Sequence, residues 1–193
     1  QLYAAYKKYA LSAGIAECVS YLISMVFTKS QNRRVRIYGG KDMQVVTSIN
    51  CFYDAAFRAP VEEQITRLYD AGFRALDMNF WDWCHDPQSP FMTEGWQDWM
   101  GRIADTAARL NIKFVQAHAH VYNFYREPDA LDKYELLRRS LEGAAMLNIP
   151  WVVFHPSRMP EMSEDETIKG NVEYFKPFVK LAEELHTGIA LEN

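Results

Sequence analysis

The sequence has little cysteine and no glycine-rich phosphate-binding fingerprint. Its three cysteines, Cys18, Cys51 and Cys84, are scattered without a CxxC spacing, which fits a reducing compartment better than a disulfide scaffold. We therefore expect a cytoplasmic protein. No GxGxxG motif follows the first expected strand, and this absence weakens a dinucleotide-binding fold.

The sequence also lacks an overall excess of basic residues, because its net charge is −4. Residues 1–43 contain seven Lys and Arg and two acids, whereas residues 44–193 contain 14 Lys and Arg and 23 acids. A protein that binds nucleic acid without sequence specificity needs a basic surface to replace the counterions of the phosphates. The acidic body of this chain therefore disfavours a nucleic-acid partner.

Residues 1–42 differ from the rest of the chain. The segment from Tyr9 to Phe27 is mostly apolar and has basic residues on both sides, a pattern typical of a signal peptide or membrane helix. Glu17 lies in the middle of this segment, where a carboxylate is costly, so a membrane role is disfavoured. A membrane-tethered or partner-binding module built on these residues stays open as an alternative.

A further interpretation concerns the start of the protein. The chain begins with Gln1, and Met43 opens a segment that reads as a first strand. We hypothesise that residues 1–42 are an N-terminal extension outside the native coding sequence, and that residues 43–193 form the structured part. Peptides from before Met43 in a mass spectrum of the native protein would contradict this.

From Met43 onward one unit recurs, an amphipathic helical pattern followed by a short apolar run. A residue that tolerates the left-handed conformation precedes each run: Gly72, Asn111, Asn148 and Gly188. Such residues end helices, and short runs buried on both faces are typical of parallel strands. With a first strand at about Val45 to Asn50, the sequence predicts five strands and four helices in an α/β fold.

The polar residues favour a barrel over a doubly wound sheet, because barrel chemistry lies at the C-terminal ends of the strands. The expected strands end in potential ligands or acid–base groups: Asp77 and Asn79, His118 and His120, His155, and Glu192. A complete (β/α)8 TIM barrel needs eight units and about 250 residues. We therefore expect residues 43–193 to be the N-terminal part of such a barrel, truncated after its fifth strand.

Strand alternation predicts which side chains share a face. Phe114, Gln116, His118 and His120 are expected on the inner face, and His155 lies at the same offset from Asn148 as His118 does from Asn111. The two imidazoles are therefore expected to be neighbours. Two histidines and Glu192 at one end of a barrel favour a divalent-metal site, although each histidine alone also fits a hydrogen-bonded core residue. His85 is expected on the surface, and His186 at a helix end.

Three segments occur in order: Gln116-Ala117-His118-Ala119, Val152-Val153-Phe154-His155-Pro156-Ser157 and Ile189-Ala190-Leu191-Glu192-Asn193. They resemble the strand-three, strand-four and strand-five segments of the xylose isomerase-like TIM barrels, the superfamily of sugar phosphate isomerases/epimerases and apurinic-site endonucleases. Asp77 departs from the pattern, because many members have a glutamate there.

The resemblance implies that Glu192 is a metal ligand and one of two acid–base carboxylates, which move a proton next to a carbonyl through an enediolate. It implies a divalent cation (Mn, Mg, Co or Zn) and a small-molecule sugar or sugar phosphate as substrate. The substrate-binding residues would be His118, His155, Asp77, Asn79 and His120. Because the remaining ligands come from strands six to eight, we expect the fragment itself to be inactive.

Several alternatives remain open. One is a zinc-dependent apurinic-site endonuclease-like phosphoesterase, in which the corresponding His, His and Glu ligate zinc ions. Another is a barrel that binds sugar without turning it over. The aromatic residues after the second and third strands, such as Trp81 and Trp99, fit hydrophobic cover for long loops better than an apolar wall over a sugar ring. The oligomeric state, including a homo-oligomer, is not fixed.

Overall fold

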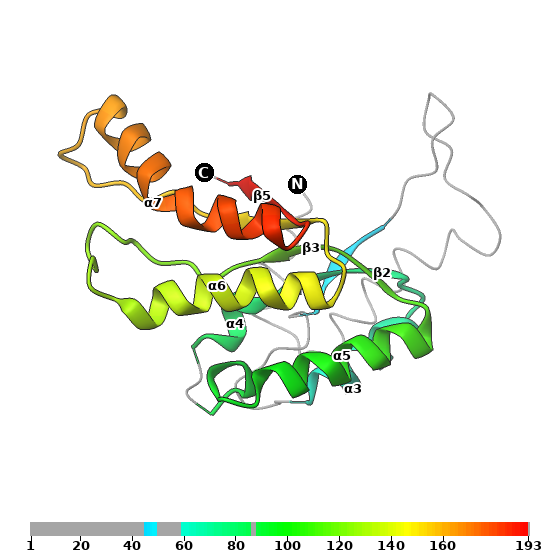
Figure 1. The fold of residues 1–193 in the computed structure, drawn as a ribbon. Helices are drawn as coiled ribbons and strands as arrows, with labels where there is room; N and C mark the ends of the chain where they lie inside the picture. The colour runs from blue at the N-terminus through cyan, green and yellow to red at the C-terminus, as the bar shows by residue number, and fades with distance from the viewer. Residues whose placement is uncertain (1–44, 50–58, 86–87, 193) are drawn as a thin grey trace, which may run out of the picture. The chain divides into compact units, whose positions relative to one another are not determined.

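The computed structural model describes residues 45–49, 59–85 and 88–192 (Figure 1). The predictions about residues 1–42 and about a start at Met43 concern residues outside the described ranges, and they stay predictions. The fold described below is that of the unit Val46–Asn193. In the part of the chain that the structure describes, no helix is both long and apolar enough to cross a membrane.

The described strands form one parallel sheet whose spatial order equals their order in the chain, β1-β2-β3-β4-β5. Their bounds are β1 Thr47–Ser48, β2 Ala75–Asn79, β3 Lys113–His118, β4 Trp151–Phe154 and β5 Gly188–Leu191. A doubly wound sheet reverses its strand order at a switch point, and this sheet does not. Its sequential order is that of a (β/α)8 barrel, so the predicted partial TIM barrel agrees with the observed topology.

Four long helices alternate with the strands: α3 Val61–Asp70, α5 Trp96–Leu110, α6 Leu131–Met146 and α7 Glu164–Glu184. Each packs against the next along the chain, and α6 contacts both β3 and β4 (Figure 1). Two short elements were not predicted, α4 Phe80–Trp83 and the 3-10 helix η2 Pro90–Met92. A single turn carries too few residues to show a helical period.

Three of the four predicted helix terminators are correct. Gly72, Asn111 and Asn148 have positive φ values of 99°, 52° and 54°. The fourth was wrong, because the positive φ after α7 belongs to His186, at 57°, and Gly188 is already the first residue of β5. Gly188 has a packing role instead, since a Cβ there would lie 2.4 Å from the Trp151 ring.

The core lies between the sheet and the helices and is built from apolar residues of both. Its largest fully buried side chains include Ile65, Leu76, Met78, Phe80, Phe91, Ile103, Leu141, Phe154 and Phe178. Four of the aromatic residues that follow the second and third strands belong to this core: Phe80, Trp96, Trp99 and Phe124 are buried. Hydrophobic cover is therefore the role the structure gives to these four, whereas Trp81 is 40% exposed.

One irregularity in β3 corrects the predicted alternation. Phe114 pairs with Leu76 and Gln116 pairs with Asp77, so Val115 is an extra residue between the two pairs. Because successive residues of a strand point to opposite faces, Phe114 does not share a face with Gln116 and His118, and this part of the prediction was wrong. Beta-bulges of this kind re-aim the side chains that follow them.

Candidate active site

Four polar residues come together at the carboxyl edge of the sheet. Asp77 lies in β2, His118 is the last residue of β3, and His155 and Glu192 directly follow β4 and β5. Parallel strands bring their carboxyl ends to the same edge, which explains how residues 115 positions apart in the chain meet. We call Asp77, His118, His155 and Glu192 the strand-end cluster.

The cluster is a chain of contacts. The Nδ1 atom of His118 lies 2.9 Å and 3.2 Å from the two carboxylate oxygens of Asp77. The Nε2 atom of His118 lies 3.4 Å from Oε2 of Glu192, and Nε2 of His155 lies 3.9 Å from the same oxygen. The rings of His118 and His155 are stacked with centroids 6.4 Å apart, as their equal offset in the sequence predicts.

The electrostatics of His118 follow from these contacts. Its hydrogen bond with Asp77 raises its pKa above the ordinary value, partial burial opposes this shift, and Glu192 adds to it. The protonated imidazole donates from Nδ1 to Asp77 and from Nε2 towards Glu192. In the neutral form the bond to Asp77 keeps the proton on Nδ1, so Nε2 becomes an acceptor. Asp77 therefore selects the tautomer of His118.

The structure places the carboxylate of Asp77, a predicted substrate-binding residue, against the His118 ring. Its side chain is only 10% exposed, whereas that of Glu192 is 58% exposed. The carboxylate of Asp77 is therefore less accessible to a ligand than that of Glu192. No pattern in the sequence could indicate this pairing, because it depends on the register that the bulge at Val115 sets.

Asn79 and His120 lie beside the cluster with polar atoms that lack partners. Asn79 is opposite His118 in the sheet register. Its Oδ1 atom and both ring nitrogens of His120 are buried without a hydrogen-bond partner among the described residues. His120 is 7% exposed, and burial, together with His85 and Lys133, lowers its pKa to about 4. His120 is therefore a neutral imidazole at pH 7.

His85, predicted to be a surface residue, is exposed but is not isolated. Its ring centroid lies 5.8 Å from that of His120 and 4.7 Å from that of Trp81. The exposed ring of His85 thus lies between the buried imidazole of His120 and the ring of Trp81, contacting both. This contact could not be predicted from a local pattern, because 34 residues lie between the two histidines in the chain.

The cluster contains side chains of the kinds that bind metal ions. Glu192 offers a carboxylate, and the imidazoles of His118 and His155 lie against it. Within the described ranges, however, no group of three or more His, Cys, Asp or Glu side chains is placed to hold a metal ion. A cation at Glu192 would therefore need ligands from outside these residues.

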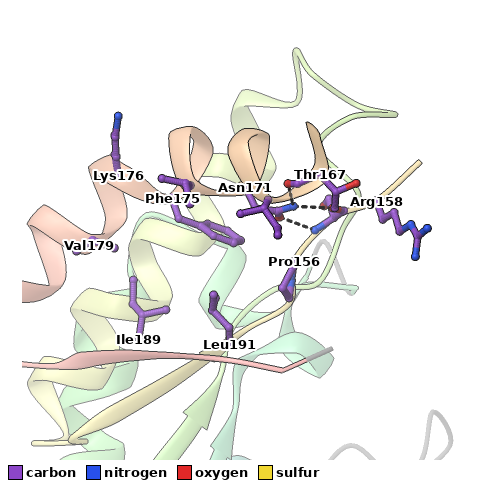
Figure 2. A pocket seen from close by; sticks show the side chains of 12 residues that line it. Pro156, Arg158, Thr167, Asn171, Phe175, Lys176, Val179, Ile189 and Leu191 are labelled. Carbon is purple, nitrogen blue, oxygen red and sulfur yellow. Dashed lines mark hydrogen bonds between the residues drawn. The ribbon is translucent and has the colours of Figure 1, made fainter. Parts of the chain in front are cut away.

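A large cavity lies on the other face of β5 (Figure 2). This groove has a volume of ≈ 750 Å³, and its apolar lining is Ile168, Val172, Phe175, Val179, Ile189 and Leu191. Leu191 lines the groove, and Glu192, the next residue, faces the histidines of the cluster. Leu191 and Glu192, although successive in the chain, therefore belong to two separate sites, the groove and the strand-end cluster. The groove is not part of the candidate active site.

Comparison with known proteins supports the fold. No family model matches the sequence, and no curated protein matches it. Among solved structures, a D-tagatose 3-epimerase-like protein superposes with a TM-score of 0.57 at 19% identity, over 78% of this chain and 53% of that one. A D-psicose 3-epimerase solved in the presence of D-fructose gives 0.54 at 14% identity, over 77% and 52%. A xylose isomerase domain protein from Planctomyces limnophilus gives 0.54 at 10% identity, over 78% and 53%.

These similarities establish the class of fold. The chain has the xylose isomerase-like TIM barrel fold, as the sequence predicts, and its solved neighbours are sugar epimerases and isomerase-domain proteins. The chain spans about half the length of each of them. Its five strands therefore correspond to part of a barrel.

Proposed function

We propose that this chain is the N-terminal part of a metal-dependent sugar or sugar phosphate epimerase or isomerase, in which Glu192 moves a proton next to a carbonyl. The main observation behind this proposal is that two imidazoles lie near one oxygen of Glu192. Nε2 of His118 is 3.4 Å and Nε2 of His155 is 3.9 Å from Oε2 of Glu192. The structural neighbours named for D-tagatose and D-psicose epimerisation support the substrate class.

The geometry supports a different role for each member of the strand-end cluster. Glu192 is the most exposed member of the cluster, at 58%, so its carboxylate can reach the C–H bond next to a ketose carbonyl. It removes the proton to give an enediolate and becomes a carboxylic acid, and a second carboxyl group in its protonated form gives a proton to the carbon and becomes a carboxylate. His118 and His155, which both lie near Oε2 of Glu192, bind oxygens of the substrate, while Asp77 holds the His118 ring in place.

Glu192 would also be a ligand of the divalent cation. Such a cation polarises the carbonyl and makes the adjacent C–H bond more acidic. The other ligands would come from further β/α units of a complete barrel. For this reason we expect residues 1–193 alone to show no turnover, and we expect activity from the reading frame extended past Asn193.

The test is proton exchange. D-fructose and D-tagatose are incubated in D₂O with the extended protein and Mn²⁺, and deuterium next to the carbonyl is followed by NMR. We expect Glu192→Gln to slow exchange by about 10²–10⁴-fold, the range for loss of a positioned base, and the matched surface change Glu184→Gln to have no effect. Exchange that survives Glu192→Gln would overturn the proposal, and sugar binding without exchange would favour a non-catalytic barrel.

A further inference from the structure

The segment that follows β4 carries His155 and is held by the side chain of Asn171 in α7. The Asn171 Oδ1 atom accepts from the Ser157 backbone N–H at 2.8 Å, and its Nδ2 donates to the carbonyls of Ser157 and Thr167 at 2.8 Å and 2.7 Å (Figure 2). One amide thus pairs with both backbone polar groups of Ser157, two residues after His155. Pro156, the residue between them, has a fixed φ, so little conformational freedom separates His155 from this anchor.

The Ser157 hydroxyl joins the same segment to the loop after β3. It donates to the carbonyl of Tyr122 at 3.2 Å and accepts from the backbone N–H of Phe124 at 3.3 Å. The side chain of Asn123 donates to the carbonyl of Arg158 at 2.9 Å. These three hydrogen bonds connect the loop after β3 with the segment after β4, and Ser157, which is only 3% exposed, takes part in two of them.

The loop after β3 also packs against the same helix. Phe124 is stacked on Tyr174 of α7, with ring centroids 3.8 Å apart and an angle of 8° between the planes. Tyr125 lies against Gly170, where a Cβ would overlap its hydroxyl group. Gly170 and Tyr174 lie within one turn of Asn171 along α7. The loop, the helix and the segment after β4 are therefore packed against one another.

Asn171 is an unfavourable residue for the helix alone. It is 7% exposed in the interior of α7, on the buried side that also contains Phe175 and Phe178. Asparagine is a weaker helix former than alanine or leucine, and a buried amide costs free energy unless it is hydrogen-bonded. Two of its three hydrogen bonds go to Ser157, so this residue serves the segment after His155 more than it serves the helix.

We infer that Asn171 and Ser157 are positioning residues for His155. Asn171 ties the segment after His155 to α7, and Ser157 ties it to the loop after β3. Together they fix the His155 ring where it stacks on His118 and where its Nε2 lies 3.9 Å from Oε2 of Glu192. The inference rests on the proposed function only in taking His155 as a substrate-binding residue.

The test is the mobility of the His155 backbone amide, measured by NMR relaxation on the 193-residue chain. We expect its order parameter to fall from the rigid value of about 0.85 towards the flexible range below about 0.6 in Asn171→Leu and in Ser157→Ala. Asn171→Leu removes all three hydrogen bonds of the amide. Ser157→Ala removes only a hydroxyl, so it decides the question even where Asn171→Leu does not fold.

The matched control is Ser140→Ala. It removes another buried hydroxyl, which donates to the carbonyl of Leu136 at 2.7 Å inside α6. Ser140 has no part in the hydrogen bonds that hold the segment after β4, so we expect His155 to stay rigid in this variant. The amide of His118, whose ring is held by Asp77, is the internal control and should keep its order parameter in all variants.

Two kinds of result would overturn the inference. A His155 amide that stays as rigid as in the parent removes the role assigned to the residue replaced. An equal loss of order in Ser140→Ala, or at the amide of His118, shows general loosening rather than positioning. The measurement uses no sugar, metal or turnover. If proton exchange is absent while His155 is loosened as expected, the proposed function fails and the positioning of His155 stands.

Discussion

At the scale of single residues, His118 links the stability of the fold to pH. Its contacts with Asp77 and Glu192 raise its pKa above the ordinary value of about 6.5. A group whose pKa is raised by folding binds its proton more tightly in the folded state. Its stabilising contribution is therefore complete below the unfolded pKa and disappears as the pH rises through the folded pKa.

We expect His118→Gln to lower the free energy of unfolding most at pH 5 and least at pH 9. The measurement is urea unfolding of the metal-free chain at pH 5, 7 and 9, with parent and variant side by side. His155→Gln is the control, because its nearest carboxylate contact in the described structure is longer, at 3.9 Å. A difference between parent and His118→Gln that stays constant with pH would contradict the assignment.

His120 has the opposite effect, because burial lowers its pKa to about 4. Between the unfolded pKa near 6.5 and the folded value, the unfolded chain binds more protons, so stability falls as the pH falls through this window. We expect the parent to lose on the order of 2 kcal/mol between pH 6.5 and 4 through this residue.

His120→Phe removes the titrating group and two unpartnered buried nitrogens while keeping an aromatic ring. We expect this variant to show a flatter stability profile than the parent between pH 6.5 and 4, as measured by thermal unfolding. His85→Phe, at an exposed position, should keep the parent profile. If both variants follow the parent, the acid sensitivity arises elsewhere in the protein.

At the scale of the elements, the C-terminal end of α7 is strained. His186 adopts φ 57°, a conformation that costs a non-glycine residue about 1–2 kcal/mol. We expect His186→Gly to raise the free energy of unfolding by up to about 1 kcal/mol, part of the relief being offset by the entropy of glycine. His186→Ala keeps the Cβ and should give no such gain in equilibrium unfolding. Equal effects of the two changes would rule out backbone strain.

The elements also show what the sequence could and could not predict. The strand–helix repeat, the sheet class and the left-handed residues Gly72, Asn111 and Asn148 were predicted correctly, because each depends on local patterns. His186 was correctly expected at a helix end, but Gly188 was wrongly chosen as the left-handed residue after α7, because glycine is the usual residue in that conformation. The bulge at Val115 was missed, because register is decided by pairing with β2.

The same distinction between local patterns and long-range packing applies to the candidate site. The neighbourhood of His118 and His155 could be predicted, since both stand at the same place in equivalent repeats. The contact of Asp77 with His118 and the contact of His120 with His85 could not be predicted, because they depend on side-chain packing between different repeats. The roles proposed for these residues in binding and catalysis stay predictions.

At the scale of the whole molecule, β5 pairs only with β4 among the described residues, and the apolar groove beside it is about half exposed. Unpaired edges and contiguous apolar patches promote association between copies. The groove residues lie on the helix side of β5, away from the strand-end cluster, so association through the groove need not alter the cluster. Solubility and site geometry can therefore be tested independently.

We expect Val172→Lys to reduce binding of the dye ANS to the 193-residue chain and to raise its solubility, because the charge interrupts the apolar lining of the groove. The matched control is Leu131→Lys, at a residue that is 79% exposed and lies outside the groove. Leu131→Lys removes as large an apolar side chain but leaves the groove intact, so dye fluorescence should match that of the parent. An equal fall of fluorescence in both variants would show that the dye reports general surface hydrophobicity, and the groove would then have no special role in the association of the chain.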